Sequence, residues 1–241
     1  MTMPTVQLET IRVSGQRGFS LLELLITVVI LVAVLGVVVS GVTELQRNNT
    51  RQAANVDLTQ ESRQFMDQVV QDLHQAGFPS VAMFDPATSA GNTNLFANGL
   101  INISSTAIQY EADFDGTGVS EVFVQLSPAA GPCPCTLRRG AVLKSLYATG
   151  TNPTYYTEVD GVANLNIFTA YDFAGNAIPL PCTNPNYVPS ANYVPAICAD
   201  GTTPITNIKN VGLLLNVQSK APDPTTRAFT NITVSTEAKI H

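Results

Sequence analysis

A long apolar run lies near the beginning of the chain. It extends from Phe19 to Val42 and contains one charged residue, Glu23. As an α-helix rising about 1.5 Å per residue it would measure about 36 Å, and the apolar interior of a bilayer is about 30 Å thick. The run therefore predicts a helix that spans a membrane. Arg12 and Arg17 precede it, and because basic residues next to a span stay in the cytoplasm, we expect the chain after Val42 to be exported.

Apolar residues then recur at helical spacing as far as Ala76, and no proline interrupts them after Thr43. The recurring positions are Leu45, Ala53, Val56, Phe65 or Met66, Val69 or Val70, and Leu73. Spacings of three and four residues are typical of an amphipathic helix. Gly77, with Phe78 and Pro79 after it, is a strong stop signal. We therefore expect one helix over residues 20–76, whose amphipathic part, counted with its stop signal, covers residues 43–77.

From residue 78 onward apolar and polar residues alternate, which is typical of strands. Strands are expected at residues 107–112, 119–126, 137–147, 162–171, 211–217 and 229–240. The segment DFDGTG between the first two is a turn sequence, so these two strands should form a hairpin. The economical arrangement is an antiparallel sheet, in a head of residues 78–241, packed on the apolar face of the amphipathic helix. The predicted fold class is α+β.

Composition and charge narrow the classes of function that the chain can have. The chain has 241 residues, 45% of them hydrophobic and 12% charged, and its net charge is −6. Such a chain can bury a sizeable core, and it has no overall basic field, so DNA is not an expected partner. Arg138 and Arg139 are interpreted as a surface pair, and with Lys144 they are the only candidates for DNA contact.

Catalytic patterns are missing from the sequence. It has two histidines, His74 and His241, and shows no Ser-His-Asp grouping, no histidine pair at metal-binding spacing and no glycine-rich phosphate loop. We therefore expect a protein that is not an enzyme and that carries no cofactor.

Residues 17–25, RGFSLLELL, resemble the processing site of type IV prepilins and of the pseudopilins of type II secretion. The resemblance joins a short basic leader, Gly-Phe at the cut, a Glu five residues on and an uninterrupted apolar helix. It implies that a membrane-embedded prepilin peptidase and methyltransferase cuts between Gly18 and Phe19, removes the leader 1–18 and methylates the new amine of Phe19. Residues 19–42 would then form the transmembrane and assembly half of the helix.

Glu23 has a role that agrees with this processing. Cleavage would create an α-ammonium at Phe19, and a carboxylate about one turn away can pair with it in a low dielectric. The partner amine could belong to the same subunit. The resemblance implies instead the amine of a neighbouring subunit in a fibre, which would help to set the axial register.

Four cysteines, Cys133, Cys135, Cys182 and Cys198, all lie on the expected exported side, where an even number favours disulfides. We favour a bond between Cys182 and Cys198. In the chain-entropy model, closing this loop stabilises the folded state by about 3 kcal/mol. Cys133 and Cys135 would then form a tight local bridge or stay reduced, and crossed pairings remain open.

The loop 182–198 contains a near repeat, NYVPSA followed by NYVPA. Its prolines cannot lie inside a sheet because each lacks an amide donor, so an extended surface loop is expected. Tyr187 and Tyr193 are candidates for contact with a partner, with incidental aromatic residues in a stapled loop as the alternative.

A weak calcium candidate consists of Asp113, Asp115, Thr117 and Glu121. These residues supply oxygen ligands, but they lack the EF-hand spacing and its carboxylate at the twelfth position. A glycine-rich hairpin turn explains the same residues, so no metal is expected.

Residues 72–78, DLHQAGF, further resemble the helix-ending segment of PilW-type minor pilins. The combined resemblance implies a minor pilin, a structural subunit that takes part in the priming or tip assembly of a type IV pilus. Such a pilus is used in adhesion, twitching motility or DNA uptake. A J-type pseudopilin of type II secretion is one alternative, and a membrane-tethered extracytoplasmic binding module is another.

The resemblance also implies partners and a location. The partners are the prepilin peptidase, other major and minor pilins, the inner-membrane assembly platform and membrane lipid. The location is the inner membrane, with a cytoplasmic N-terminus and an exported head, followed by the extracellular pilus or a periplasmic pseudopilus.

Overall fold

The computed structural model describes residues 20–189, 193–220, 222 and 226–240. The expected leader 1–18 and Phe19 therefore lie outside the described residues. The chain divides into two units after Asn49. The long helix α1, Leu21–Gln75, contributes its first part to one unit and its last turns to the other. Its bounds differ by one residue at each end from the helix that the sequence predicts.

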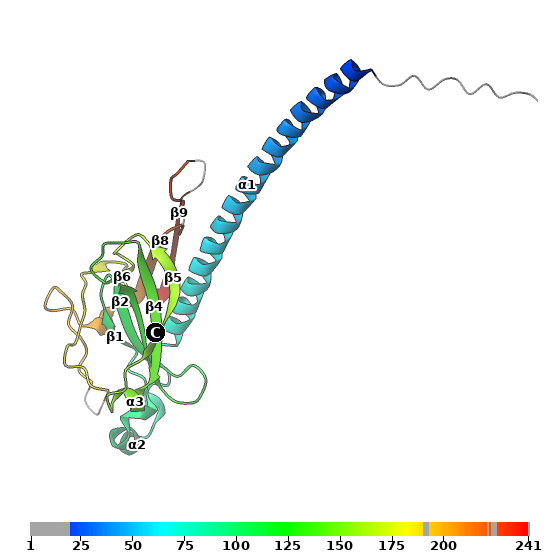
Figure 1. The fold of residues 1–241 in the computed structure, drawn as a ribbon. Helices are drawn as coiled ribbons and strands as arrows, with labels where there is room; N and C mark the ends of the chain where they lie inside the picture. The colour runs from blue at the N-terminus through cyan, green and yellow to red at the C-terminus, as the bar shows by residue number, and fades with distance from the viewer. Residues whose placement is uncertain (1–19, 190–192, 221, 223–225, 241) are drawn as a thin grey trace, which may run out of the picture. The chain divides into compact units, whose positions relative to one another are not determined.

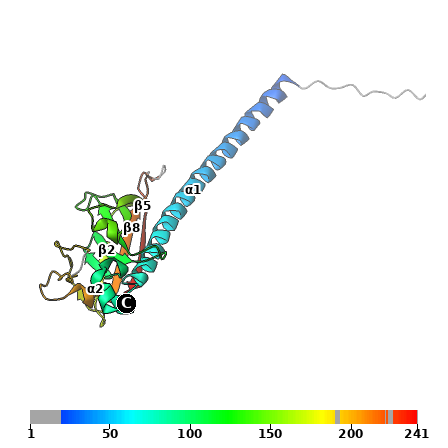
Figure 2. The same cartoon turned by 90° about the horizontal axis from the view of Figure 1, so that it is seen from below.

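The second unit is the head, shown with its labelled elements in Figure 1 and, turned, in Figure 2. After α1 its elements are η1 Val81–Met83, α2 Pro86–Gly91, η2 Thr93–Leu95, β1 Leu100–Ile103, β2 Ala107–Ala112, β3 Ser120–Ser127, β4 Cys135–Leu143, α3 Lys144–Tyr147, β5 Thr154–Val162, β6 Phe168–Tyr171, β7 Ala177–Ile178, η3 Ile205–Asn207, β8 Asn210–Gln218 and β9 Asn231–Lys239.

The strands form one antiparallel sheet in the order β1-β2-β3-β4-β5-β8-β6-β7, and β9 pairs with β8 along its whole length. In the hairpin β2–β3, Ile108 lies opposite Val124 and Tyr110 opposite Val122. These apolar residues share one face, and Gln109, Glu111, Glu121 and Phe123 share the other, because side chains alternate along a strand. The hairpin therefore has a face that packs on α1 and an opposite face that carries glutamates.

The last turns of α1 are part of the core of the head. The buried residues of this helix recur on one stripe: Leu58, Ser62, Phe65, Met66, Val69, Asp72 and Leu73. The apolar members belong to the same hydrophobic cluster as the inward residues of the strands. At about 25 cal/mol per Å² of buried apolar surface, this stripe stabilises the head by many kcal/mol before entropy is counted.

Gly77 ends the helix as the sequence predicts. Its φ is +88°, a left-handed conformation that favours glycine. Its amide donates to the carbonyl oxygen of Glu111 at 2.9 Å, which attaches the end of the helix to β2. A Cβ at Gly77 would also meet the Cα of Gly99 at 3.5 Å, so the chain passes close to itself at this point.

The α+β class is confirmed: a long N-terminal apolar helix is followed by an antiparallel sheet, which is a pilin-like architecture. Two expected strands differ from the observed ones. Residues 162–171 are not one strand, because β5 ends at Val162 and β6 begins at Phe168. In the gap, the side chain of Asn164 donates to the carbonyl of Leu214 and accepts from the amide of Asn216, so it bonds to β8 rather than extending a strand.

The second difference concerns residues 137–147. Strand β4 ends at Leu143, and Lys144–Tyr147 form the short helix α3. The side chain of Lys144 points into the head, where it pairs with Glu111, so it does not continue the alternation of side chains along β4. Strands β1 and β7 and most of β5 were not predicted.

Candidate functional site

The apolar part of α1 is long and apolar enough to cross a membrane. Its most apolar stretch of 18 residues has a mean hydropathy of 3.0, and none of these residues is buried within the protein. The hydroxyl groups of Thr27, Ser40 and Thr43 donate to carbonyl oxygens three or four residues earlier, at 2.8 to 2.9 Å. Such bonds satisfy polar groups inside the helix itself, as a lipid environment requires.

Glu23 lies in the first turn of α1 and is exposed. Within the part of the chain that the structure describes, its carboxylate forms no hydrogen bond and no ion pair. Its amide donates to the carbonyl of Ser20, which starts the helix. Gly18 and Phe19 lie outside the described residues, so the pairing with the Phe19 amine stays a prediction.

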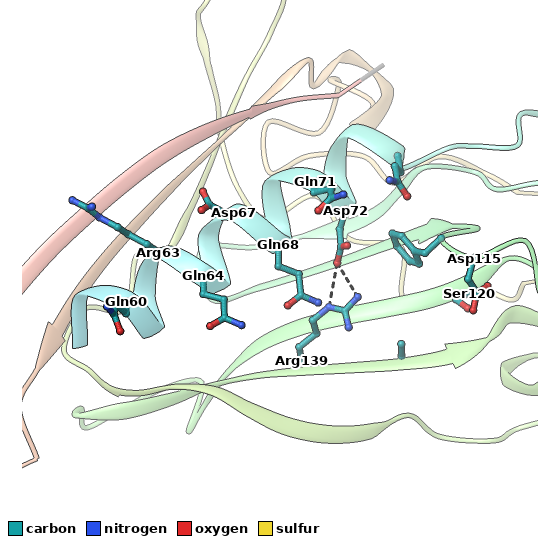
Figure 3. A pocket seen from close by; sticks show the side chains of 13 residues that line it. Gln60, Arg63, Gln64, Asp67, Gln68, Gln71, Asp72, Asp115, Ser120 and Arg139 are labelled. Atoms are coloured by element: carbon teal, nitrogen blue, oxygen red, sulfur yellow. Dashed lines mark hydrogen bonds and ion pairs between the residues drawn. The ribbon is translucent and has the colours of Figure 1, made fainter. Parts of the chain in front are cut away.

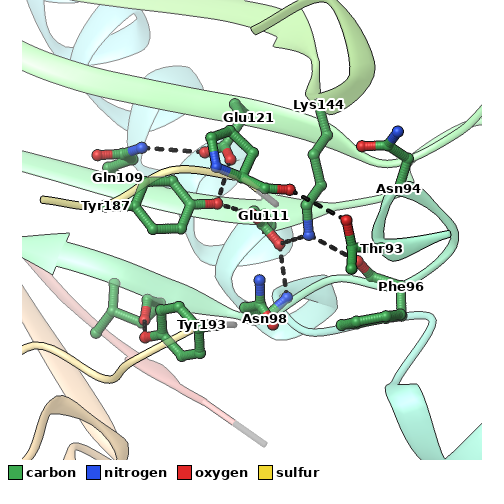
Figure 4. A network of polar contacts seen from close by, with 12 residues as sticks. Thr93, Asn94, Phe96, Asn98, Gln109, Glu111, Glu121, Lys144, Tyr187 and Tyr193 are labelled. Atoms are coloured by element: carbon green, nitrogen blue, oxygen red, sulfur yellow. Dashed lines mark hydrogen bonds and ion pairs between the residues drawn. The ribbon is translucent and has the colours of Figure 1, made fainter. Parts of the chain in front are cut away.

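A network of charged and polar side chains occupies the other unit, on the sheet face opposite α1 (Figure 4). Glu111 on β2 and Glu121 on β3 lie directly across from each other, and both are fully buried. Lys144, also fully buried, donates to Glu111 Oε2 at 2.8 Å and to the carbonyl of Phe96 at 3.0 Å. The network therefore contains two buried carboxyl groups but a single cation, which pairs with Glu111.

Tyr187 joins the two glutamates. Its hydroxyl group contacts Glu111 Oε1 and lies 2.5 Å from Glu121 Oε1. A hydroxyl has a single hydrogen, so both contacts can be hydrogen bonds only if one carboxyl group is protonated. Glu111 is the acid paired with Lys144, which leaves Glu121 to hold the proton and donate it to Tyr187 Oη.

The surroundings of Glu121 agree with this assignment. Burial, followed by the charge of Glu111, raises the pKa of Glu121 to about 9. Its other oxygen accepts from Gln109 Nε2 at 3.0 Å, and Gln109 Oε1 accepts from Asn102 Nδ2 at 2.6 Å. The network is thus a continuous chain of donors and acceptors with no net charge while Glu121 is neutral.

The network holds the loop 182–198 against the sheet. Besides Tyr187, the amide of Asn184 donates to Asn102 Oδ1 at 2.6 Å, and Tyr193 donates to the carbonyl of Leu100 at 3.1 Å. The rings of Tyr187 and Tyr193 meet edge to face with centroids 6.0 Å apart. Both hydroxyl groups therefore point into the head, and contact of either tyrosine with a partner stays a prediction.

Two disulfides are present. Cys182 is bonded to Cys198, the pairing that the sequence favours, and Cys133 is bonded to Cys135. Backbone hydrogen bonds also join Cys182 to Ile103 of β1 in both directions, at 2.8 and 2.9 Å. One end of the loop is therefore fixed to the sheet, and the disulfide fixes the other end to it.

A second polar cluster lies on the α1 face of the sheet. Asp72 on α1 accepts from Arg139 Nε at 3.1 Å, from Arg139 Nη2 at 2.8 Å and from the Tyr110 hydroxyl at 2.7 Å. Burial, and then the charge of Asp72, raise the pKa of Tyr110, so the phenol remains a donor. This cluster joins α1 to β2 and β4.

The interpretation of Arg139 as a surface residue is wrong, and so is the candidacy of Lys144 for DNA contact. Arg139 is half-buried and paired with Asp72, and Lys144 is buried and paired with Glu111. Each of these two cations is already paired with a carboxylate, and of the three residues only Arg138 is exposed.

The calcium candidate residues are not assembled around one point. Asp113 accepts from the amide of Gly116, and Asp115 accepts from the amide and hydroxyl of Thr117, so both carboxylates close their own turn. Glu121 belongs to the buried network. In the described residues, no group of three or more His, Cys, Asp or Glu side chains is arranged to hold a metal.

Comparison with known proteins gives one result. Residues 13–41 match the family model of the prokaryotic N-terminal methylation motif. No curated protein and no solved structure gives a significant match. The matched segment includes Gly18, Phe19, Glu23 and most of the apolar run. The motif supports a membrane-anchored, exported protein of type IV pilin or pseudopilin type, a class of structural proteins that prepilin peptidase and the pilin assembly machinery process.

Proposed function

We propose that the chain is the precursor of a minor pilin, a structural subunit that takes part in the priming or tip assembly of a type IV pilus. The leader 1–18 is removed, residues 19–42 anchor the subunit in the inner membrane, and residues 43–77 continue the helix into the exported head of residues 78–241. The finished subunit then enters the extracellular fibre beside other major and minor pilins.

The exposed apolar helix with its single acid supports this proposal most directly. Glu23 lacks a partner in the described residues, and a carboxylate inside a spanning segment costs about 2.5 to 3.5 kcal/mol at the bilayer centre and less near an edge. An α-ammonium on Phe19, created by cleavage after Gly18, would neutralise it. In a fibre, the ammonium of a neighbouring subunit would pair with Glu23 and fix the axial position of the incoming subunit.

Mass spectrometry of the mature N-terminus tests the processing step. We expect a chain that begins at a monomethylated Phe19, and a Gly18→Leu variant that keeps its leader. Retention of Met1 on the wild-type protein in cells with active prepilin peptidase would refute the proposal.

A Glu23→Val variant separates processing from assembly. It should be cleaved normally, because the cut precedes Phe19, but it should be depleted from sheared surface fibres. A Glu44→Val variant is the matched control, since Glu44 lies on the same helix beyond the apolar run. Wild-type amounts of the Glu23 variant in fibres would contradict the pairing.

Two other functions make different predictions in the same cells. The methylation motif is common to pilins and pseudopilins, so a J-type pseudopilin would leave surface fibres unchanged on deletion and would stop protein secretion. A membrane-tethered binding module would remain entirely in the inner-membrane fraction under conditions that produce pili.

A further inference from the structure

A groove of about 1010 Å³ lies between the last turns of α1 and strands β3 and β4 (Figure 3). It is on the sheet face that packs on α1, so it is separate from the network around Glu111. One wall is the helix, and the other is formed by Ser120 at the start of β3 and by Arg139 and Ala141 on β4. Phe114 and Asp115 border one end.

The helix wall is a row of glutamines. Its members are Gln60, Gln64, Gln68, Gln71 and Gln75. Steps of four, four, three and four residues keep them on one face of the helix. In the part of the chain that the structure describes, none of these side-chain amides forms a hydrogen bond. Figure 3 shows Gln64 and Gln68 pointing from the helix into the groove.

The spacing of this row matches an extended polypeptide. Successive glutamines four residues apart stand about 6 Å apart along the helix axis. An extended strand repeats every two residues, which is about 6.7 Å. A primary amide has one acceptor and two donor positions, so it can bond both the N–H and the C=O of one peptide residue. Glutamines four residues apart, namely Gln60 with Gln64, Gln64 with Gln68 and Gln71 with Gln75, can therefore bond alternate residues of a strand lying along the groove. Gln68 and Gln71 lie only about 4.5 Å apart along the axis and do not fit this repeat.

The opposite wall is rigid and offers a place for side chains. Arg139 is held in position by its two hydrogen bonds to Asp72, and Ala141 leaves room beside it. Tyr156 on β5 lies directly across from Arg139, so it faces the same side of the sheet. This tyrosine is 68% exposed, which places an aromatic ring beside the groove, available to a bound side chain.

We propose that this groove binds an extended peptide segment of a partner protein, whose backbone is held by the row of glutamines. The row spans about 22 Å, which corresponds to roughly seven residues of extended chain. Recognition is mainly of the backbone, and Tyr156, Arg63 and Asp67 on the borders select among sequences. This binding is independent of cleavage at Gly18 and of fibre assembly.

The test uses the purified full chain in detergent micelles. A phage-displayed library of random ten-residue peptides is selected on it, and the enriched peptides are synthesised with a fluorescent label. We expect binding that weakens about tenfold in Gln64→Ala, because two net hydrogen bonds are lost, and still further in Gln64→Ala/Gln68→Ala. Both residues lie outside the core, so the variants should keep the thermal melt of the wild type.

The matched control is Gln52→Ala, an exposed glutamine on α1 that does not line the groove. It should bind the peptides as the wild type does. A second probe is the same peptide with N-methyl groups on alternate backbone amides, which keeps every side chain and removes the donors that glutamines would meet. It should no longer bind.

Four results would overturn the proposal. They are a selection that enriches no peptide, binding that is equal in Gln64→Ala and wild type, full binding of the N-methylated peptide, and an oligosaccharide on a glycan array that binds in place of peptides and is lost in Gln64→Ala. The last result would assign the groove to a sugar.

Discussion

The proton on Glu121 should make the stability of the head depend on pH. The pKa of this acid is raised from 4.5 to about 9 in the folded protein. Between these values the folded state binds one proton more than the unfolded state, so the free energy of unfolding falls as pH rises. The contribution is complete below the unfolded pKa and is lost as pH approaches the folded pKa.

The slope of the free energy of unfolding against pH follows from the uptake of one proton. Between the two pKa values it does not depend on the size of the pKa shift. It is about 1.4 kcal/mol per pH unit, or about 2.7 kcal/mol between pH 6 and pH 8. A Glu121→Gln variant should lose this slope, because glutamine can accept from Gln109 and donate to Tyr187 as the neutral acid does. It should therefore be more stable than the wild type at pH 8, and this difference should shrink toward pH 6.

The assay is urea unfolding of the oxidised full chain in detergent micelles at pH 6, 7 and 8. Tyrosine fluorescence reports on the head, since the chain has seven tyrosines and no tryptophan. The exposed Glu237 on β9 supplies the control, and Glu237→Gln should keep the wild-type slope. If Glu121→Gln and the wild type differ by the same amount at every pH, Glu121 is not the protonated group and the reasoning is refuted.

Three further predictions concern the same head. Lys144→Met should lower the free energy of unfolding by about 3 to 5 kcal/mol in urea, because it leaves Glu111 buried without its cation. Asp72→Asn should cost about 2 kcal/mol in the same assay, because it weakens two charge-assisted hydrogen bonds. Replacing both Cys182 and Cys198 by serine should cost about 3 kcal/mol and lower the Tm, because the loop is no longer closed in the unfolded chain.

Each of these predictions has an outcome that contradicts it. A Lys144→Met protein as stable as the wild type would show that Glu111 takes up a proton instead. Unchanged unfolding of Asp72→Asn would show that Arg139 is solvated rather than paired. Identical melts with and without the Cys182–Cys198 bond would show that the sheet holds the loop without help.

Regular patterns made much of the fold predictable. The helix and the hairpin of β2 and β3 follow from periods that persist over many residues, with stop and turn signals at their ends. Strands β1 and β7 have four and two residues, too few for a period to appear. The break between β5 and β6 depends on the side chain of Asn164 reaching β8, which is a contact between distant parts of the chain.

The buried network was hidden for a similar reason. Gln109 and Glu111 alternate with apolar residues on β2, which is the pattern of a solvent-facing side. That side is covered instead by Tyr187, which is 76 residues away from Glu111 in the sequence. Spacing indicated one disulfide pairing, but it could not show that the loop between the two cysteines carries the group that joins two acids.

The shared helix has a mechanical consequence for the head. Any tension that reaches residue 50 travels along the backbone of α1 into the turns that carry Phe65, Val69 and Leu73. Axial pulling would load these side chains, together with the Asp72 to Arg139 bonds, in shear and all at once. Because many contacts must yield simultaneously, the head should resist stretching along this helix better than peeling of the helix sideways, one turn after another.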